Sequence, residues 1–399
     1  EYSKPLINRE LHIVSFDIPY PADYGGVIDV FYKIKALSEL GIRIHLHCYF
    51  HHRSFSNTLE SLCETVNYYP RTTSILKQIS KTPFIINSRN SRLLLHRLNE
   101  KTCQILFEGL HTTAVLLEDK SIGMRSSIRT HNVEHHYYKH LMLAESNILK
   151  RIYYYLESKK LKPYQQLLKK AKKIITISSG DYHYFRQRYN DKVSYIPAFH
   201  PYTEVTSDTG TGKYLLYHGN LSVVENEKAA MFLIKKVMPG LLTPLIIAGK
   251  NPTKKLRIEI AKHSNIQLIE NPDQLRMEQL IKEAQIHLLP TFQPTGVKLK
   301  LVASLYEGRH IIANDQMTKG FPENKLIFRA NKPEEFRNKI QKIFEIPFTD
   351  NDIAARTIFL NEHFNNQKNA LDLTKEIYNY RGDAAAHAWT SPPNSDNLP

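Results

Sequence analysis

Cysteine is scarce in this chain of 399 residues, and Cys48, Cys63 and Cys103 lack the number and spacing of a disulfide framework or a zinc site. No apolar run approaches the roughly 20 residues that a membrane-spanning helix needs. No segment with the basic, apolar and small-residue order of a signal peptide opens the sequence. We therefore expect a protein of the reducing cytoplasm that does not span a membrane.

Acidic residues are also in the minority, because 39 Asp and Glu face 54 Lys and Arg and leave a net charge of +15. Such an excess favours a polyanion, an anionic membrane surface or phosphorylated ligands. The sequence has no zinc-finger spacing, no RNA-recognition aromatic box and no basic-region heptads. We therefore predict no nucleic-acid partner, and the charge alone does not decide between the remaining classes.

Apolar runs of strand length alternate with amphipathic helical stretches along the chain, which is typical of parallel sheets covered by helices on both faces. The first series of predicted strands lies at 11–16, 42–50, 103–109, 126–131, 173–178 and 193–197. A segment rich in Pro, Thr, Ser and Gly follows at 197–212. The pattern then restarts with strands at 214–220, 244–250, 266–270, 286–291 and 310–315.

This repetition predicts an α/β fold with two Rossmann-like doubly wound domains, at 1–200 and 201–365, as expected for a chain of this length. A helix is predicted at 366–381, because apolar residues recur there at helical spacing, and we expect it to pack back on the first domain. Residues 382–399 are small, polar and Pro-rich, and we expect a disordered tail or an added remnant there.

Open parallel sheets bind ligands at the carboxyl ends of their strands, so residues that follow the predicted strands are the candidate site residues. In the first domain they are Gly25, Gly26, Glu108, His111, Arg129, His131 and Asn132. Paired glycines let the backbone approach an oxyanion, although a simple Pro-Gly turn explains Gly25 and Gly26 equally well. We predict no metal at His131 and His135, since His131 ends a strand and shares no helix face with His135. A helix-capping Asn132 beside an exposed histidine pair is the main alternative.

In the second domain, glycine and a basic residue recur at three strand ends. These ends hold His218, Gly219 and Asn220, then Gly249 and Lys250, then Thr295, Gly296, Val297 and Lys298. A helix that starts after a glycine presents unpaired amides and a positive dipole end, and Lys298 and Lys300 add charge there. The pattern favours a phosphate site over an ordinary loop with solvated lysines. Asn226, between Glu225 and Glu227, either begins a helix or accepts sugar hydroxyls.

Five segments carry a family resemblance: HNVEHHYY (131–138), LKRIYYYLESKKLKPYQ (149–165), ITISSGDYHYF (175–185), YHGNLSVVENEKAAMFL (217–233) and GVKLKLVASLYEG (296–308). In this order they resemble bacterial retaining glycosyltransferases of the GT-B fold, of the family 4 (group 1) type, and the resemblance covers about residues 10–380. It implies two domains that face each other across a cleft, with the C-terminal helix crossing back to the first. It also implies transfer of a sugar from a nucleotide sugar, held mainly by the second domain, to a glycan or lipid-linked acceptor, without metal or cofactor.

The resemblance implies roles for single residues. Gly25 and Gly26 match a glycine loop that faces the donor phosphates, His131 matches a residue that contacts the transferred sugar, and Lys298 matches a positively charged residue that neutralises the departing diphosphate. His131 and Lys298 are thus the predicted catalytic residues. The predicted donor-binding residues are Gly25, Gly26, His218, Gly219, Asn220, Asn226, Lys250, Thr295, Gly296 and Val297. The predicted acceptor-side residues are Glu108, His111, Arg129 and Asn132.

One departure from the family pattern concerns the donor. Two glutamates eight positions apart are usual, but Thr295 and Ala303 stand at the matching positions. Either the ribose is held by another group, such as Glu225 or Glu307, or donor binding is weakened or lost.

The leading hypothesis is a hexosyltransferase-like enzyme for capsule, lipopolysaccharide or another cell-surface polysaccharide. A degenerate relative that binds sugar nucleotides or glycans without transfer is the first alternative, and a protein that binds polyanions or membranes by charge alone is the second. The basic and aromatic segment 150–173 suits anionic lipid headgroups at the inner face of the cell membrane, with Lys169, Lys170, Lys172 and Lys173 as the test residues, although a solvated helix face is an equal explanation. His131 is expected to be needed for turnover and not for folding.

Overall fold

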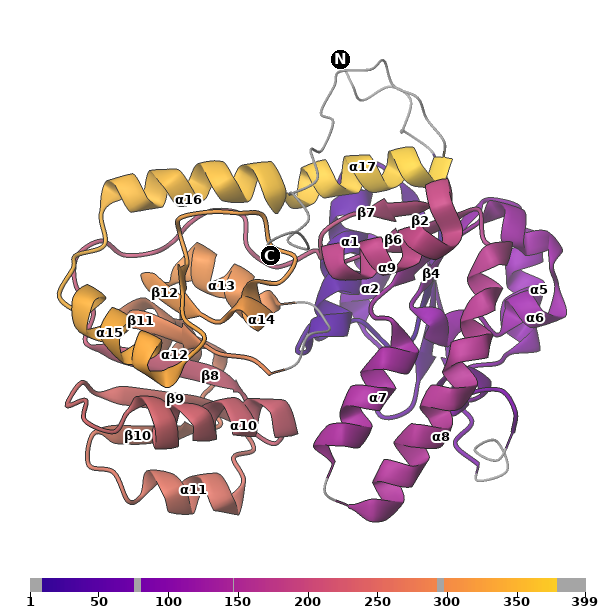
Figure 1. Ribbon diagram of the computed structural model, residues 1–399. Helices are drawn as coiled ribbons and strands as arrows, with labels where there is room; N and C mark the ends of the chain where they lie inside the picture. The colour runs from indigo at the N-terminus through magenta and orange to yellow at the C-terminus, as the bar shows by residue number, and fades with distance from the viewer. Residues whose placement is uncertain (1–8, 75–79, 146, 293–297, 379–399) are drawn as a thin grey trace, which may run out of the picture. The chain divides into compact units, whose positions relative to one another are not determined.

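The computed structural model describes residues 9–74, 80–145, 147–292 and 298–378. The described part of the chain divides into two units (Figure 1). Residues 9–201 and 364–378 form the first unit, and residues 202–292 with 298–363 form the second.

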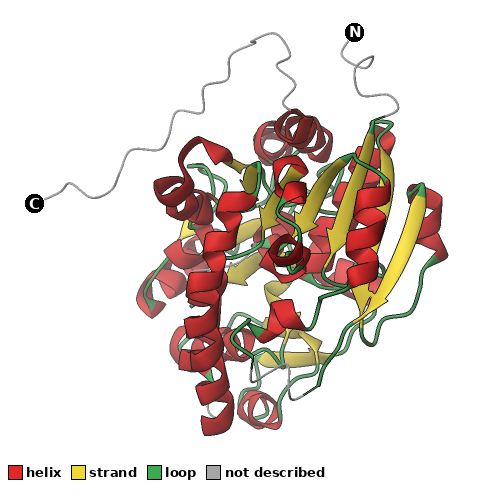
Figure 2. Cartoon of the chain, turned by 90° about the vertical axis from the view of Figure 1, so that its right-hand side faces the viewer, coloured by secondary structure: helices red, strands yellow, loops and turns green. Residues whose placement is uncertain are grey.

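The first unit is built on a seven-stranded parallel sheet with the strand order β3-β2-β1-β4-β5-β6-β7. The strands are β1 (Glu10–Ser15), β2 (Arg43–Phe50), β3 (Thr65–Pro70), β4 (Gln104–Glu108), β5 (Ser126–Thr130), β6 (Lys173–Thr176) and β7 (Val193–Tyr195). Figure 2 shows the strands flanked by helices. The main helices are α1 (Gly25–Glu39), α2 (Asn57–Leu62), α4 (Phe84–Asn87), α5 (Arg92–Glu100), α6 (Val115–Glu118), α7 (Glu134–Ala144), α8 (Ile148–Tyr164), α9 (Ser179–Tyr189) and α17 (Asn366–Tyr378).

Helix α17 packs on the first unit although it follows the second unit in the sequence. Its residues Ala370, Leu373 and Ile377 have no exposed surface and belong to the apolar core on one face of the first sheet. The Lys172 ammonium donates to the carbonyl of Ile377 at 2.9 Å, and the Tyr378 hydroxyl donates to the carbonyl of Glu10 at 2.9 Å. The helix is therefore an integral part of the first unit.

The second unit contains a six-stranded parallel sheet with the strand order β10-β9-β8-β11-β12-β13. Its strands are β8 (Tyr214–Asn220), β9 (Leu245–Lys250), β10 (Ile266–Glu270), β11 (Ala284–Leu289), β12 (His310–Ala313) and β13 (Phe328–Arg329). The main helices are α10 (Val224–Phe232), α11 (Lys254–Ile260), α12 (Gln274–Glu283), α13 (Leu299–Glu307), α14 (Asp315–Thr318), α15 (Pro333–Ile343) and α16 (Asp350–His363). The predicted pair of doubly wound α/β sheets is confirmed. Among the described residues, no helix has the length and apolar character to span a membrane.

A chain of buried and partly buried hydrogen bonds, all donated in the same direction, crosses three strands of the first sheet. Arg97 donates to the Tyr69 hydroxyl at 3.2 Å, and that oxygen lies 2.8 Å from His47 Nδ1. His47 Nε2 lies 2.9 Å from His12 Nδ1, and His12 Nε2 lies 3.0 Å from the carbonyl of Lys101. Because that carbonyl can only accept, each imidazole donates from Nε2 and accepts at Nδ1, and both rings are neutral.

Acid is expected to destabilise this arrangement. Burial lowers the pKa of His12 to about 4 and holds the pKa of His47 well below 6.5. The unfolded chain therefore binds more protons between pH 6.5 and 4, so the free energy of unfolding should fall as the pH drops through that window. For His12 alone the loss is about 3 kcal/mol, at about 1.4 kcal/mol per pKa unit. Urea unfolding at pH 7, 5.5 and 4.5 measures it, and replacing both rings by Gln should flatten the dependence.

Candidate functional site

The carboxyl ends of β8 and β9 lie against each other in the second unit. Gly219 is paired with Gly249, and Asn220 with Lys250. A Cβ atom on Gly249 would stand 1.7 Å from the Gly219 carbonyl oxygen, so only glycine fits this close approach. Two of the three predicted glycine-containing strand ends are thus brought together at one edge of the sheet.

Lys300, in the first turn of α13, reaches this edge. Its Nζ donates to Asn226 Oδ1 at 2.7 Å and lies 5.0 Å from the centre of the Tyr217 ring. A Cβ atom on Gly219 would lie 2.5 Å from that Nζ, so the glycine leaves room for the ammonium group. Burial, with a smaller effect from the charge of Lys298, lowers the pKa of Lys300 to about 7. An anionic ligand beside Lys300 would raise this pKa and keep the ammonium fully protonated at neutral pH.

The other residues predicted to bind the sugar donor have different contacts at the carboxyl edge of the second sheet. The Asn220 side chain accepts from the amide and hydroxyl of Ser222, and its carbonyl accepts from Asn226, so both asparagines order the turn after β8. Burial, with a smaller effect from Lys300, lowers the pKa of His218 to about 3 and keeps this ring neutral. Lys250 is exposed at the end of β9, and Lys298 directly precedes α13. Thr295, Gly296 and Val297 lie outside the described residues.

The two alternatives for a ribose carboxylate are placed very differently. Glu307 is the last residue of α13, which starts at the carboxyl edge of the sheet, so it lies about 12 Å farther along at 1.5 Å per residue. Glu307 is therefore too far from the edge to hold a ribose there. Glu225 lies in the first turn of α10 and remains the candidate. Ala303 is buried within α13, so a larger side chain there would have to displace its neighbours.

In the first unit, five charged or polar side chains form a buried network at the ends of β4 and β5. Lys33 Nζ lies 2.9 Å from Asp29 Oδ2 and 2.8 Å from Glu108 Oε1. Arg129 donates to both oxygens of Asp29, at 2.9 and 2.8 Å, and His131 Nε2 lies 3.1 Å from Glu108 Oε2. Four of these side chains have no exposed surface, and His131 is 7% exposed.

Charges in this network are matched. Burial by itself would raise the pKa of both carboxyl groups, but Lys33 and His131 hold the pKa of Glu108 below its usual value. Arg129 and Lys33 likewise hold the pKa of Asp29 well below its usual value. Oxygen and nitrogen atoms of Asp29, Glu108 and His131 are close enough to share an ion. A divalent cation would nevertheless add charge where two cations already neutralise two carboxylates, so the residues do not fit a resident metal.

The predicted glycine loop lies close to this network. The Phe16 ring packs edge-on against His131, with ring centres 5.3 Å apart, and lies 5.5 Å from His111. A Cβ atom on Gly26 would lie 2.8 Å from Phe16 Cζ, so glycine lets the start of α1 approach that ring. Gly26, His111 and His131 are therefore grouped at the carboxyl edge of the first sheet.

The remaining acceptor-side residues differ in what they can contact. The buried Arg129 guanidinium donates hydrogen bonds to Asp29 and to the carbonyls of Ile196 and Pro197. It therefore positions the network and is not exposed to a sugar acceptor. Asn132 lies beside the buried Glu134, whose pKa burial raises to about 8, with a smaller effect from Asp181. His111 Nδ1 lies 3.9 Å from Glu134 Oε1. His111 and Asn132 thus frame a protonated carboxyl group.

Known proteins resemble this chain in sequence and in fold. Residues 212–345 match the family model described as glycosyl transferases group 1. An uncharacterized 44.6 kDa protein in the cps region of Klebsiella pneumoniae is 27% identical over 336 residues, covering 78% of this chain and 84% of that protein. The structure of Anabaena Alr3699/HepE in complex with UDP and glucose is similar, with a TM-score of 0.64, 11% identity and coverage of 92% of this chain and 99% of that one. TarM is similar at a TM-score of 0.64 and 9% identity, over 94% and 100% of the two chains.

The chain is a glycosyltransferase of the GT-B fold. The predicted enzyme class and fold are thereby confirmed. At such low identities the solved structures support the fold, and the match at 212–345 places the group 1 domain on the second unit.

Two residues of this glycosyltransferase, Asp29 and Lys33, were missed in the sequence, and Lys300 was named as a charge at the helix start without being assigned to the donor-binding residues. Asp29 and Lys33 sit four residues apart on α1, and Lys33 falls between Val30 and Leu37, which are both fully buried. A charge within an apolar helical stripe is the signal that reveals them. Lys300 is the second lysine of the KLK sequence, and only the structure distinguishes it from Lys298.

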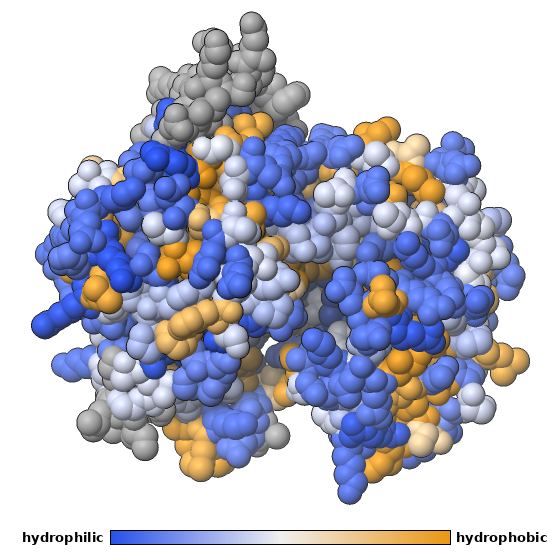
Figure 3. All heavy atoms as spheres, turned by 180° about the vertical axis from the view of Figure 1, so that it is seen from behind, coloured by the Kyte–Doolittle hydropathy of each residue, from blue (hydrophilic) through white to orange (hydrophobic). Residues whose placement is uncertain are grey.

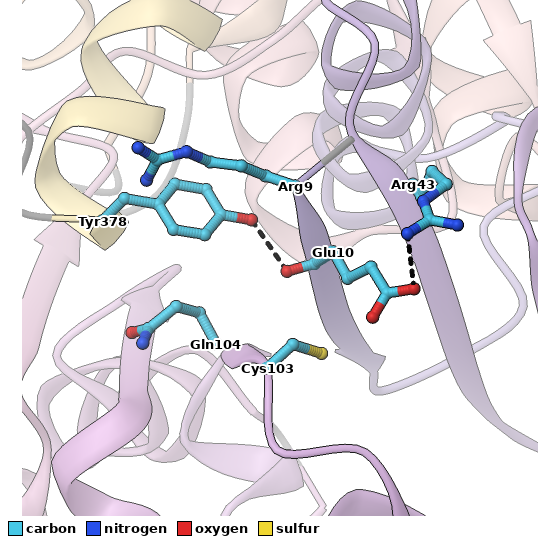
Figure 4. A pocket seen from close by; sticks show the side chains of 6 residues that line it. All are labelled: Arg9, Glu10, Arg43, Cys103, Gln104 and Tyr378. Carbon is cyan, nitrogen blue, oxygen red and sulfur yellow. Dashed lines mark hydrogen bonds and ion pairs between the residues drawn. The ribbon is translucent and has the colours of Figure 1, made fainter. Parts of the chain in front are cut away.

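A pocket of about 390 Å³ lies elsewhere in the first unit of the glycosyltransferase, at the amino ends of its strands (Figure 4). Its lining residues are Arg9, Glu10, Arg43, Cys103, Gln104 and Tyr378. Arg43 pairs with Glu10 at 3.0 Å. Because it opens at the edge opposite the candidate site residues, it belongs to neither of their clusters.

Proposed function

We propose that this glycosyltransferase transfers a hexose from a nucleoside diphosphate sugar to a glycan or lipid-linked acceptor in the synthesis of a cell-surface polysaccharide. In this proposal the enzyme retains the anomeric configuration, needs no metal ion and acts in the cytoplasm, including at the inner face of the membrane. Capsule is the favoured product, because a relative comes from a cps region, and lipopolysaccharide is the other candidate.

The observation that carries the donor assignment is the ammonium of Lys300 between Gly219 and Asn226. Among the described residues this partly buried cation donates to one carboxamide oxygen, and an ammonium has three donors, so it can also bind a phosphate oxygen. The start of α13 and Lys298 add positive charge beside it. Alr3699/HepE structures that contain UDP or UDP-glucose, on the same fold, support a nucleotide diphosphate sugar as the ligand.

The chemistry of transfer requires stabilisation of the negative charge that develops on the leaving diphosphate. In our proposal Lys300, Lys298 and the amides at the start of α13 supply it. His131, held in orientation by Glu108, contacts the transferred sugar. Gly25 and Gly26 let the backbone at the start of α1 approach the ligand, and His111 with Asn132 faces the acceptor.

The proposal is tested by incubating the purified protein with a panel of UDP, GDP and ADP sugars and measuring release of the nucleoside diphosphate. We expect release from one donor class, and the same rate after treatment with EDTA. Binding of a nucleotide sugar without any turnover, with acceptor glycans present, would favour the alternative of a non-catalytic binder. If the protein binds none of these nucleotide sugars, both the transferase proposal and the non-catalytic alternative are refuted.

A further inference from the structure

The hairpin of helices α7 and α8 carries an unusual amount of apolar side chain on its surface. Ile148 and Leu149 are 70% and 74% exposed at the start of α8, and Leu143 is 63% exposed near the end of α7. Ile152, Tyr155 and Leu156 continue the exposed row along α8, each about half exposed. At 100° per residue the five residues of α8 fall within an arc of about 120°, so they form one stripe, here called the apolar stripe.

The opposite face of α8 accounts for its packing on the rest of the unit. Glu157 and Leu161 are buried, and the Glu157 carboxylate accepts from the Phe84 amide at 2.6 Å and pairs with Lys160 at 2.9 Å. Glu157 is the single acidic residue in the sequence of α8. The apolar stripe is therefore not needed to hold the helix in place.

Cations accompany the apolar stripe without balancing acids on the helix. Arg151 and Lys162 border the stripe, and Lys159 lies within it. All three are exposed, and the Lys159 ammonium lies 5.4 Å from the centre of the Tyr155 ring. Exposed apolar side chains framed by lysine and arginine are the features of a helix that lies in the interface of an anionic membrane. Figure 3 shows hydrophobic side chains scattered among hydrophilic ones on one face of the molecule, so single exposed apolar residues are ordinary here, and what matters on α8 is the stripe together with its cations.

Three of the four test lysines that follow α8 do not share this role. Lys170 donates to the Leu116 carbonyl, Lys172 donates to the Ile377 carbonyl, and Lys173 pairs with Glu376 at 2.7 Å. These three side chains stabilise the first unit, so charge reversal there would disturb its packing. The lipid-binding residues expected from the sequence are thus better sought at 143–162 than at 169–173.

We propose that the α7–α8 hairpin docks on anionic bilayers, with the apolar stripe inserted among the headgroups and its flanking cations bound to lipid phosphates. A second copy of the chain is a poorer occupant, because a symmetric contact through α8 would bring like charges together across an apolar patch. This surface rests on its own geometry and does not depend on the donor assignment.

Vesicle sedimentation tests the proposal with phosphatidylcholine vesicles that contain or lack phosphatidylglycerol. The protein should bind the anionic vesicles, and added salt should weaken the binding. The pair Ile148→Gln with Ile152→Gln, and the pair Arg151→Glu with Lys159→Glu, should each weaken partitioning by about tenfold or more. Matched controls are Leu242→Gln, at a residue that is 94% exposed, and the pair Lys254→Glu with Lys342→Glu, both exposed.

Insertion is tested separately by fluorescence. In a Trp389→Phe background, Ile148→Trp should shift its emission to shorter wavelength when anionic vesicles are added, whereas Leu242→Trp should not. Unchanged thermal unfolding and unchanged nucleotide binding of the α8 variants would show that a loss is specific to the surface. Equal binding by the α8 variants and their controls, equal binding to neutral vesicles, or a change in self-association in place of vesicle binding would overturn the proposal.

Discussion

Replacing Lys300 with Met should weaken the binding of a nucleoside diphosphate by about 10- to 100-fold, because a charge-assisted hydrogen bond contributes roughly 1.5 to 3 kcal/mol. Binding of the nucleoside monophosphate should change much less if the ammonium contacts the outer phosphate. Lys298→Ala should show the same selectivity with an equal or smaller effect. Lys236→Met, at an exposed lysine of the same unit, is the matched control. Calorimetry with UDP, GDP and ADP supplies the measurement.

The pH dependence gives an independent readout of the same lysine. Since the pKa of Lys300 is about 7 in the ligand-free protein, a bound diphosphate should raise it and take up a proton above pH 7. Affinity should therefore fall as the pH rises from 7 to 9 in the natural chain, and this part of the dependence should vanish in Lys300→Met. Unchanged affinity in both Lys300→Met and Lys298→Ala would remove the donor site from the second unit.

Loss of the imidazole in His131→Ala should lower the rate of sugar transfer by about 10²-fold or more, the size of a lost transition-state contact. The buried hydrogen bond to Glu108 changes one earlier expectation, because the substitution also removes a partner of a fully buried carboxylate. A loss of about 1 to 3 kcal/mol in the free energy of unfolding should accompany it.

Separating the two effects requires a partial replacement. His131→Gln can still donate a hydrogen bond toward Glu108, so it should recover stability while transfer stays slow. His183→Ala, at an exposed histidine of α9, should change neither quantity. Full transfer activity in His131→Ala would remove His131 from the site, whatever happens to the stability.

Much of the fold could be predicted because buried parallel strands are apolar runs with helices between them. The central strands β1, β4 and β8 were found within a residue or two in this way. Edge strands are harder to predict from the sequence, because they are hydrogen-bonded to a neighbouring strand along one edge only and their residues stay partly exposed. Strand β3, with the sequence TVNYYP, has a single fully buried residue and ends in proline, so nothing in its pattern separates it from a loop.

The candidate site was predictable where chemistry follows a strand end. Gly219, Gly249 and His131 were found because the carboxyl edge of a parallel sheet is known in advance. The buried network behind His131 could not be predicted in this way. Asp29 and Arg129 are 100 residues apart in the sequence, and only the folded sheet brings Arg129 Nη2 to 2.8 Å from Asp29 Oδ1. Charge pairing over such a distance leaves no local pattern.

The position of α17 affects the order in which the protein can fold during synthesis. Until the ribosome has made residues 366–378, the first sheet lacks the helix that buries Ala370, Leu373 and Ile377 against it. The described residues of the second unit, 202–292 and 298–363, all precede α17 and can form their core earlier, whereas the unit that is translated first is finished last. A nascent chain therefore leaves the part of the first core that α17 covers open to solvent until residue 378 has been made, and a chain that ends before α17 would keep it open.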